Sequence, residues 1–380
     1  MSRGGEAAAG WCRRLLLKRA AVGTGALGLA GTRLGGAEVA AVAQTAETAQ
    51  TAELAETANK VKDADDERPF WFGFIGDTPY SRLEEGALRM VLDAMANQPL
   101  EFVLHVGDIK SSLETCNDDL VSSRLALLDA CPHPLILTPG DNEWTDCGRL
   151  LSPWESGSRL ERLDWLRANA YGRPQSLGAR RMAVDQQGPY VSARSHGSIK
   201  GGPSTGSDQL EAPRLPENLR WRIGALQFCT LHVVGSNNAP RRAPELDEAW
   251  LLRQQANGEW LNDTVRKARR EKARGLVIGL HANMRFEDNR NDGWERMRQL
   301  VIAAAVAFDG PVLLLHGDTH HFRTDRLLQR SHGLANFVRV ECFGSPFSSS
   351  WVQIRWDPEQ AQAGMATESD CFQVSIRTLP

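Results

Sequence analysis

The sequence predicts an α/β fold, because segments with the pattern of buried strands alternate with segments of helical pattern. Strands expected at 70–76, 100–106 and 134–138 are separated by helices expected at about 82–97 and 118–130. Strands separated by helices usually pair in parallel within a layered sheet. Four of the apolar strand segments are also followed by the dipeptide Gly-Asp. Each such aspartate lies at the carboxyl edge of its strand, where α/β sheets bind ligands.

The rest of the chain continues this alternation around one segment that is rich in Gly, Ser and Pro. The elements expected there are a helix within 152–172, a surface excursion at 188–218, a strand at about 223–234, a helix at 245–273, a strand at 275–280, a helix at about 294–307 and a strand at 311–316. The last part, 335–378, alternates like the strands of a second sheet with no helix between them.

The N-terminal residues have the pattern of an export signal. Arg13 and Arg14 precede a short apolar segment at 20–31, and residues 41–43 form a small-x-small cleavage site. The apolar segment is too short and too rich in glycine for a stable membrane span. We therefore expect a periplasmic or secreted protein that the twin-arginine export machinery recognises. The expected parts are a signal peptide at 1–43, a low-complexity linker at 44–69 and one globular domain at 70–380.

Charge and cysteine content narrow the function further. The net charge is −3, so the sequence lacks the basic signature of a nucleic-acid binder. Cleavage after residue 43 would leave six cysteines, and an oxidising destination permits disulfides. We favour a pair between Cys116 and Cys147, in the loops after two Gly-Asp strands, although spacing does not fix connectivity. Cys229 and Cys342 lie in strand patterns and are expected to be buried thiols.

Polar residues at the strand ends predict a metal centre. One Gly-Asp turn is common, so the prediction depends on the whole set. Four aspartates follow apolar runs, a histidine ends a further apolar run, and two histidines lie beside the last aspartate. Such a set is difficult to explain without a metal ion. The residues at these strand ends are Asp77, Asp108, Asp141, Asp318 and His281, with His320 and His321 beside the last aspartate.

In order and spacing these motifs resemble those of the calcineurin-like metallophosphoesterases, which include the purple acid phosphatases. The family pattern is D-x-H, G-D, G-N-H-D or G-N-H-E, a lone His, and G-H-x-H. The matching blocks here are Gly76-Asp77-Thr78-Pro79, Gly107-Asp108, Gly140-Asp141-Asn142-Glu143, His281 and Gly317-Asp318-Thr319-His320. The resemblance implies a four-layer α/β/β/α sandwich with two mixed sheets, and a site for two divalent metal ions in the domain at 70–380.

Carried over by position, the resemblance implies two ligand sets that share Asp108. One ion would bind Asp77, Asp108 and His320, and the other would bind Asp108, Asp141, His281 and Asp318. Four carboxylates favour Mn, Fe, Mg or Ca over Zn. Pro79 stands where the family has a histidine, so one metal lacks a ligand. Water, His316, His321 or Tyr80 could replace it, or only one ion is held tightly.

The resemblance implies one catalytic position, and the residues themselves suggest the acid and the contacts with the substrate. Asn142 replaces the histidine that assists the leaving group in the family, and an amide cannot transfer a proton. The acid is therefore expected to be His321 or Glu143, unless the substrates have good leaving groups. Asn238, Asn283 and Arg285 are expected to bind substrate oxygens, since polar side chains at strand ends and Arg forks suit phosphate.

The expected function is metal-dependent hydrolysis of a phosphate mono- or diester in a phosphorylated small molecule. Two alternatives remain. The first is a degenerate, non-catalytic member of the same fold that binds metal or phosphate, which the missing histidines would explain. The second is a serine hydrolase, which is less favoured because Gly235-Ser236 and Gly344-Ser345 lack the G-x-S-x-G context.

Overall fold

The computed structural model describes residues 67–148, 159–188, 215–239, 244–287, 292–362 and 371–379. The expected signal peptide, nearly all of the expected linker and most of the expected surface excursion lie outside these residues. Within the described ranges, no helix has both the length and the apolar character that crossing a membrane requires.

The described strands form two mixed sheets. The first has the order β12-β11-β1-β2-β3, with β1, β2 and β3 parallel and β11 antiparallel to its two neighbours. Its strands are β1 (Phe70–Ile75), β2 (Leu100–His105), β3 (Leu135–Leu137), β11 (Ser350–Trp356) and β12 (Phe372–Thr378). Parallel strands in the middle of the sheet align their carboxyl ends at one edge.

The second sheet has the order β4-β5-β6-β7-β8-β10-β9, in which β6, β7, β8 and β10 are parallel. The strands β4, β5 and β9 pair in the antiparallel sense. The strands are β4 (Asp185–Gln187), β5 (Leu215–Ile223), β6 (Leu226–Thr230), β7 (Gly275–Gly279), β8 (Val312–His316), β9 (Arg323–Asp325) and β10 (Phe337–Glu341).

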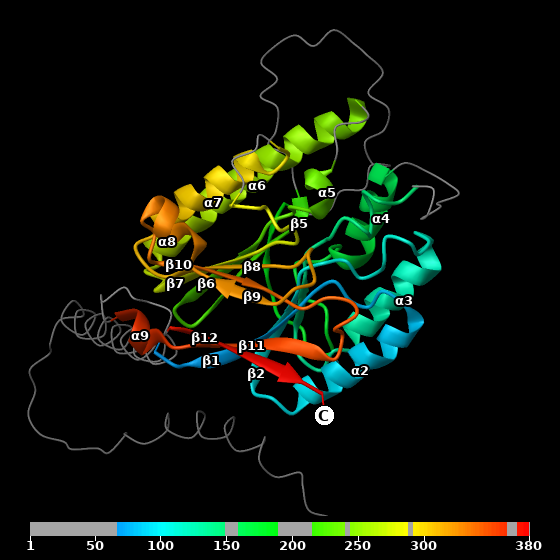
Figure 1. Cartoon of the computed structure of the whole chain (residues 1–380), viewed down its shortest axis with the longest axis horizontal. Coiled ribbons are helices and arrows are strands. Elements are labelled where there is room, and N and C mark those ends of the chain that lie inside the picture. The colour runs from blue at the N-terminus through cyan, green and yellow to red at the C-terminus, as the bar shows by residue number, and fades with distance from the viewer. Residues whose placement is uncertain are drawn as a thin grey trace, which may run out of the picture. The chain divides into compact units, whose positions relative to one another are not determined.

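Helices cover the outer faces of both sheets (Figure 1). The apolar faces of α2 and α3 pack on the first sheet, and those of α6 and α7 pack on the second. The helices are α2 (Arg82–Ala96), α3 (Asp118–Asp129), α4 (Arg159–Ala170), α5 (Gly235–Asn238), α6 (Pro244–Arg270), α7 (Glu295–Ala307), α8 (Leu327–His332) and α9 (Pro358–Gln362). The predicted four-layer α/β/β/α sandwich with two mixed sheets is confirmed.

Aromatic side chains fill the space between the sheets. Phe72 and Phe102 of the first sheet stack with centroids 5.0 Å apart, and both meet Phe228 of the second sheet edge to face. Trp221 in turn stacks on Phe228 at 5.0 Å. Aromatic pairs of this kind contribute about 0.5–1.5 kcal/mol each beyond the area that they bury. This core fixes one sheet against the other.

Two expectations for the strands were wrong. The single strand expected at 223–234 is a hairpin, in which Gly224 turns the chain with φ +51° between β5 and β6. β5 also begins at Leu215, within the expected surface excursion. The strands expected within 335–378 do not share one sheet: β10 joins β8 in the second sheet, while β11 and β12 join the first, and the helix α9 lies between β11 and β12. The pairing of these three strands depends on partners in other parts of the chain, which local alternation does not reveal.

Candidate metal centre

Five strand ends bring predicted metal ligands together. Asp77, Asp108 and Asp141 follow β1, β2 and β3, while His281 and Asp318 follow β7 and β8. The possible ligand atoms of Asp77, Asp108 and His281 lie within 4.8 Å of one another. Those of Asp141, His281 and Asp318 form a second such group. Because His281 belongs to both groups, the side chains form one continuous cluster.

Backbone carbonyls orient the two histidines of the cluster. His281 Nδ1 lies 2.8 Å from the carbonyl of Val106, and His320 Nδ1 lies 2.6 Å from the carbonyl of Ser345. A carbonyl only accepts, so each Nδ1 carries a hydrogen and each Nε2 is turned towards the carboxylates. His320 Nε2 is 3.6 Å from Asp77 Oδ1, which adds a sixth side chain to the cluster. Histidines that ligate metals are commonly oriented in this way.

Four cluster residues have a left-handed backbone. The φ angles are 53° at Asp77, 57° at Asp108, 82° at Asp318 and 64° at His320. Conformations of this kind cost residues other than glycine about 1–3 kcal/mol each, and they are concentrated at functional sites. The fold therefore holds these four side chains against a local conformational preference.

Glycine backbones pass close to the carboxylates. A Cβ on Gly140 would lie 2.0 Å from Asp108 Oδ1, and a Cβ on Gly317 would lie 2.1 Å from Asp77 Oδ2. Only a residue without a side chain fits at these two positions. In these two Gly-Asp pairs the glycine thus makes room for the carboxylate of another block.

The electrostatics of the cluster favour a cation. Burial raises the pKa of Asp77 and of Asp108, and it raises the pKa of Asp318 to about 7. Burial also opposes the charge of Asp141, but the hydrogen bond and charge of His281 outweigh it and lower that pKa. Burial lowers the pKa of His281, but the carboxylates outweigh it and raise this pKa well above 6.5. One imidazolium thus balances several buried carboxylates, and a divalent cation fits the same position with release of the proton.

Of the three side chains suggested as a replacement for the missing metal ligand, Tyr80 is the one that contacts the cluster. Its Oη donates a hydrogen bond of 2.7 Å to Asp108 Oδ2 and lies 3.2 Å from His320 Nε2. Burial and then the charge of Asp108 raise its pKa. By contrast, His316 is buried, His321 is exposed, and each holds Nδ1 against a backbone carbonyl of its own loop.

Asn142 lies at the centre of the site but has little freedom. Its backbone N–H donates to Asp108 Oδ1 over 3.0 Å. Its side-chain Nδ2 lies 2.5 Å from Asp108 Oδ2 and 3.1 Å from Tyr80 Oη. The amide hydrogens therefore fix the positions of the Asp108 carboxylate and the Tyr80 phenol.

Glu143, one of the two expected acids, is only 1% exposed. Its Oε1 accepts hydrogen bonds from the backbone N–H groups of Ile109 and Gly140, over 3.2 and 3.3 Å. Burial and then the charge of Asp108 raise the pKa of Glu143 to about 8. The side chain thus joins two of the Gly-Asp turns to each other and is closed to solvent.

The three expected substrate contacts differ in accessibility. Asn283 donates its backbone N–H to Asp318 Oδ2 over 2.9 Å, and its Oδ1 accepts from the backbone of Arg285. The Arg285 side chain is exposed and makes no ion pair among the described residues. Asn238 is 1% exposed, and its amide is bonded to Arg253 and to the backbone of Gly293. Asn283 and Arg285 therefore border the site. Asn238 is buried and instead stabilises the turn after β6 through its contacts with Arg253 and Gly293.

Ser236 is a site residue that the sequence analysis did not assign. Its Oγ donates a hydrogen bond of 2.6 Å to Asp141 Oδ2. Ser236, Asn237, Asn238 and Ala239 all have positive φ, which makes the turn after β6 a run of strained residues. The sequence offered one signal for this residue: the Gly-Ser-Asn-Asn turn follows an apolar run, as the Gly-Asp pairs do.

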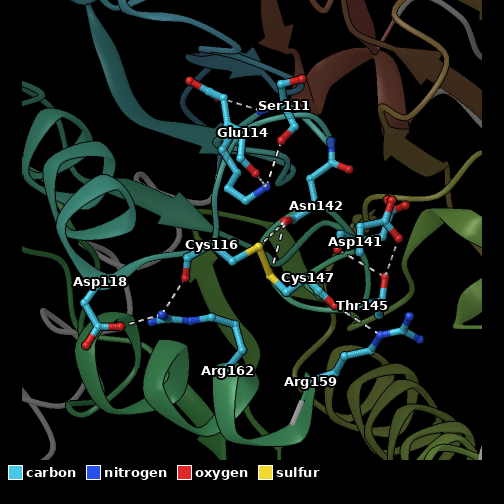
Figure 2. The surroundings of a disulfide bond; sticks show 12 residues. Ser111, Glu114, Cys116, Asp118, Asp141, Asn142, Thr145, Cys147, Arg159 and Arg162 are labelled. Carbon is cyan, nitrogen blue, oxygen red and sulfur yellow. Dashed lines mark hydrogen bonds and ion pairs between the residues drawn. A yellow bond between two sulfur atoms is a disulfide. The ribbon is translucent and has the colours of Figure 1, made fainter. Parts of the chain in front are cut away.

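A disulfide between Cys116 and Cys147 joins the loops that follow Asp108 and Asp141, as predicted. Figure 2 shows both sulfur atoms against the carbonyl of Asn142, at 3.9 and 3.8 Å. Arg162 Nη1 donates to the carbonyl of Cys116 over 2.9 Å. The disulfide thus packs against the backbone of Asn142 and stabilises the segment that carries this residue. Cys229 and Cys342 are buried thiols, as expected.

Replacing both disulfide cysteines with serine should lower the free energy of unfolding. The closed loop has a sequence separation of 31, for which loop-closure entropy gives about 3–4 kcal/mol. Urea unfolding measures the loss. Dithiothreitol should reproduce it in the wild-type protein and have no effect on the Cys116→Ser/Cys147→Ser variant. An oxidised wild type no more stable than this variant would contradict the expectation.

A buried polar network lies beneath the Asp141 loop. Glu217 is fully buried and pairs with Arg167 over 2.6 and 2.9 Å and with His232 Nδ1 over 2.7 Å. The ring of His232 meets that of Trp144 edge to face at 5.2 Å. The Arg253 guanidinium lies over the indole ring of Trp144, 5.3 Å from its centroid, and donates a hydrogen bond to the carbonyl of His232. Through Arg253 the network thus connects the turn that carries Asn238 with the loop that carries Asp141 and Trp144.

His232 should make stability fall in mild acid. Burial lowers the pKa of His232 from 6.5 to about 4, against a raising contribution from Glu217. The unfolded chain therefore binds a proton below pH 6.5 that the folded protein does not bind until about pH 4, so stability is lost as pH falls through this window. Between pH 7 and 5 the loss is about 2 kcal/mol.

Urea unfolding at pH 7 and 5 tests this expectation in a His232→Gln variant. The difference between the two pH values should be about 2 kcal/mol smaller in the variant than in the wild type. His332→Gln, at an exposed histidine, is the matched control and should keep the wild-type difference. If His232→Gln keeps the wild-type difference in unfolding free energy between pH 7 and 5, His232 is not the cause of the loss of stability in acid.

Comparisons with known proteins give fold similarity alone. No family model and no curated protein matches the sequence. A dimetal phosphatase from Danio rerio has a TM-score of 0.46 at 13% identity, over 75% of this chain and 92% of that one. A purple acid phosphatase from yellow lupin seeds has a TM-score of 0.37 at 9% identity, over 82% of this chain and 54% of that one.

A third solved structure is the anchor in the inner membrane complex of Plasmodium, with a TM-score of 0.40 at 8% identity. It covers 82% of this chain and 89% of that chain. Because every TM-score is below 0.5 and every identity below 25%, we base the conclusions that follow on the residues of this chain.

Proposed function

We propose that the protein is a metal-dependent phosphoesterase of the calcineurin-like metallophosphoesterase type, which hydrolyses a phosphate mono- or diester. The observation that supports this most strongly is the convergence of carboxylates and histidines from five strand ends into one buried cluster. Excess negative charge, left-handed backbones at the ligands and glycines that leave no space for a Cβ all fit a resident metal centre.

The ligands proposed for two ions share Asp108. Asp77 and His320 would complete one set, and Asp141, His281 and Asp318 the other. This set is rich in oxygen, which favours Mn, Fe, Mg or Ca over Zn. Bound ions would supply Lewis-acid polarisation of the phosphoryl group and would acidify a water molecule for attack.

The chain's own residues would orient the substrate and the ligands. Arg285 is exposed beside the site, and its fork can take two phosphoryl oxygens. Asn283 fixes Asp318 through its backbone and Arg285 through its side-chain oxygen. Ser236 holds the second oxygen of Asp141, which leaves Oδ1 facing His281. Together these contacts set the shape of the site before substrate arrives.

The serine hydrolase alternative is not supported by the contacts of Ser236. A catalytic serine donates its hydroxyl hydrogen to an imidazole that acts as base. Ser236 donates to the carboxylate of Asp141 instead, and among the described residues no histidine accepts from it. The non-catalytic alternative differs from the proposal only in turnover, so an activity measurement separates the two.

Full-length protein, loaded with Mn²⁺ and assayed with 4-nitrophenyl phosphate, tests the proposal. Hydrolysis should be lost on chelation with EDTA and restored by Mn²⁺. Hydrolysis that EDTA does not affect would favour the serine enzyme. Tight Mn²⁺ binding by calorimetry without turnover on any phosphate ester would favour the non-catalytic protein.

We also propose that the protein is exported by the twin-arginine route and acts in the periplasm or outside the cell. The Cys116–Cys147 disulfide supports this location, because such bonds persist in oxidising compartments. Fractionation of cells that express the full chain, with and without Arg13→Lys and Arg14→Lys changes, tests the route. Unchanged export of the doubly substituted chain would contradict it.

A further inference from the structure

The phenol of Tyr80 lies among three polar groups of the site. Its Oη is 2.7 Å from Asp108 Oδ2, 3.1 Å from Asn142 Nδ2 and 3.2 Å from His320 Nε2. Asn142 is the position where the resemblance predicts a histidine that assists the leaving group. The Tyr80 hydroxyl is therefore within one hydrogen bond of that place.

A set of contacts through Glu84 holds the phenol there. The backbone N–H of Tyr80 donates to Glu84 Oε2 over 2.8 Å, and Ser345 Oγ donates to Glu84 Oε1 over 2.6 Å. Ser345 also accepts from His320 Nδ1 through its carbonyl, and the rings of His320 and Tyr80 meet edge to face at 5.1 Å. These contacts form a closed ring, so the phenol and the imidazole are positioned together.

The phenol has a single hydrogen, and in this arrangement Asp108 accepts it. Tyr80 Oη accepts from Asn142 Nδ2 and gives its only hydrogen to Asp108 Oδ2. Asp108 Oδ2 already accepts the Asn142 amide as well. A cation held by Asp108 would compete with these two donors for the two lone pairs of that oxygen, and a displaced hydroxyl hydrogen would need another acceptor. A negatively charged oxygen of the substrate meets that need.

We propose that the Tyr80 hydroxyl donates a hydrogen bond to the leaving-group oxygen of the phosphate ester. This inference rests on the proposed phosphoesterase function and specifies the substrate class. Because the phenol donates a hydrogen bond and keeps its proton, the leaving group departs as an anion. The site therefore selects phosphate esters whose leaving groups are stable anions, such as aryl phosphates, over alkyl phosphates.

The test compares Tyr80→Phe with the wild type, both as full-length protein loaded with Mn²⁺. The substrates are phenyl phosphate and 4-nitrophenyl phosphate, which differ in how well the departing oxygen bears its charge. For phenyl phosphate, kcat/KM should fall about 10- to 100-fold, the range of one hydrogen bond to a charged group. For 4-nitrophenyl phosphate it should fall less than about threefold, because that oxygen develops less charge. The Mn²⁺ affinity, measured by calorimetry, should fall no more than about 100-fold, the range for losing a contact that orients a ligand, and both proteins are assayed at saturating Mn²⁺.

Tyr171→Phe is the matched control, since the Tyr171 hydroxyl donates to the carbonyl of Leu137 away from the cluster. It should leave the ratio of the two rates at the wild-type value. An equal fall on both substrates in Tyr80→Phe, or a complete loss of Mn²⁺ binding, overturns the role of Tyr80 and leaves the phosphoesterase function intact. Wild-type protein that binds Mn²⁺ but hydrolyses neither substrate overturns both.

Discussion

An Asp108→Asn variant should lose metal-dependent hydrolysis together with the stabilisation that metal ions give the folded protein. Asp108 belongs to one of the two ligand groups, is proposed to serve both ions, and has Oδ1 3.5 Å from His281 Nε2, the residue that both groups share. Substitution of a residue that merely orients a ligand typically costs 10- to 100-fold in metal affinity or activity. Loss of the shared ligand should therefore lower kcat/KM by more than about 100-fold.

Thermal unfolding gives the same prediction a measurement that does not depend on turnover. Mn²⁺ at about 100 times its Kd should stabilise the wild-type protein by about 2.7 kcal/mol, and the variant by much less. In EDTA the sign should reverse, because Asp108→Asn removes one of several buried carboxylates that burial and mutual repulsion disfavour. The variant without metal should therefore melt at a higher temperature than the wild type without metal.

Asp129→Asn is the matched control for these measurements. Asp129 pairs with Arg181 at the surface, and both side chains are about two-fifths exposed, at 41% and 39%. Its substitution should change neither the Mn²⁺ stabilisation nor the melting temperature in EDTA. An Asp108→Asn protein that retains wild-type activity and Mn²⁺ stabilisation would show that the cluster is not the metal centre.

The ends of the parallel strands could be predicted from the sequence because the signal is local. An apolar run that stops at Gly-Asp specifies a buried strand and the carboxylate that follows it, as at Asp77 and Asp108. The same local pattern predicted the disulfide between Cys116 and Cys147, because both loops follow such strands. Order along the chain then predicted a shared site at the carboxyl ends of the sheet.

Contacts between distant segments could not be predicted in this way. Tyr80 and His320 are separated by 240 positions, and the phenol reaches the imidazole only because β1 and β8 end side by side at the site. The pairing of β10 with β8 likewise depends on a tertiary partner. The hairpin of β5 and β6 is local, but its turn at Gly224 lies inside a run that was predicted as one strand. Burial of Glu143 also depends on the complete fold, so its position as a clamp between two turns could not be predicted from the G-D-N-E block alone.

The largest effect on stability is expected from Glu217→Ala. Glu217 is fully buried and carries the only carboxylate that pairs with both Arg167 and His232 among the described residues. Burial raises its pKa, but the charge of Arg167 and the hydrogen bond of His232 outweigh burial and hold the pKa well below its usual value. Breaking this pair, in which Glu217 is fully buried and the Arg167 side chain is 22% exposed, should cost at most about 3–5 kcal/mol, the value for a fully buried pair, which urea unfolding measures directly.

A double-mutant cycle separates loss of the charge pair from loss of packing. If the cost of Glu217→Ala comes from breaking the charge pair with Arg167, Arg167→Met in the same protein should recover part of the lost stability. Arg89→Ala, which removes an exposed pair with Glu85 at 3.5 Å on α2, is the control and should cost less than about 1 kcal/mol. Strictly additive costs for Glu217→Ala and Arg167→Met would mean that packing alone is responsible. Arg253 bonds to the carbonyl of His232 and contacts both Trp144, in the Asp141 loop, and Asn238. A non-additive result for Glu217 and Arg167 would therefore connect the stability of the Asp141 loop to Glu217, a carboxylate that touches no proposed metal ligand.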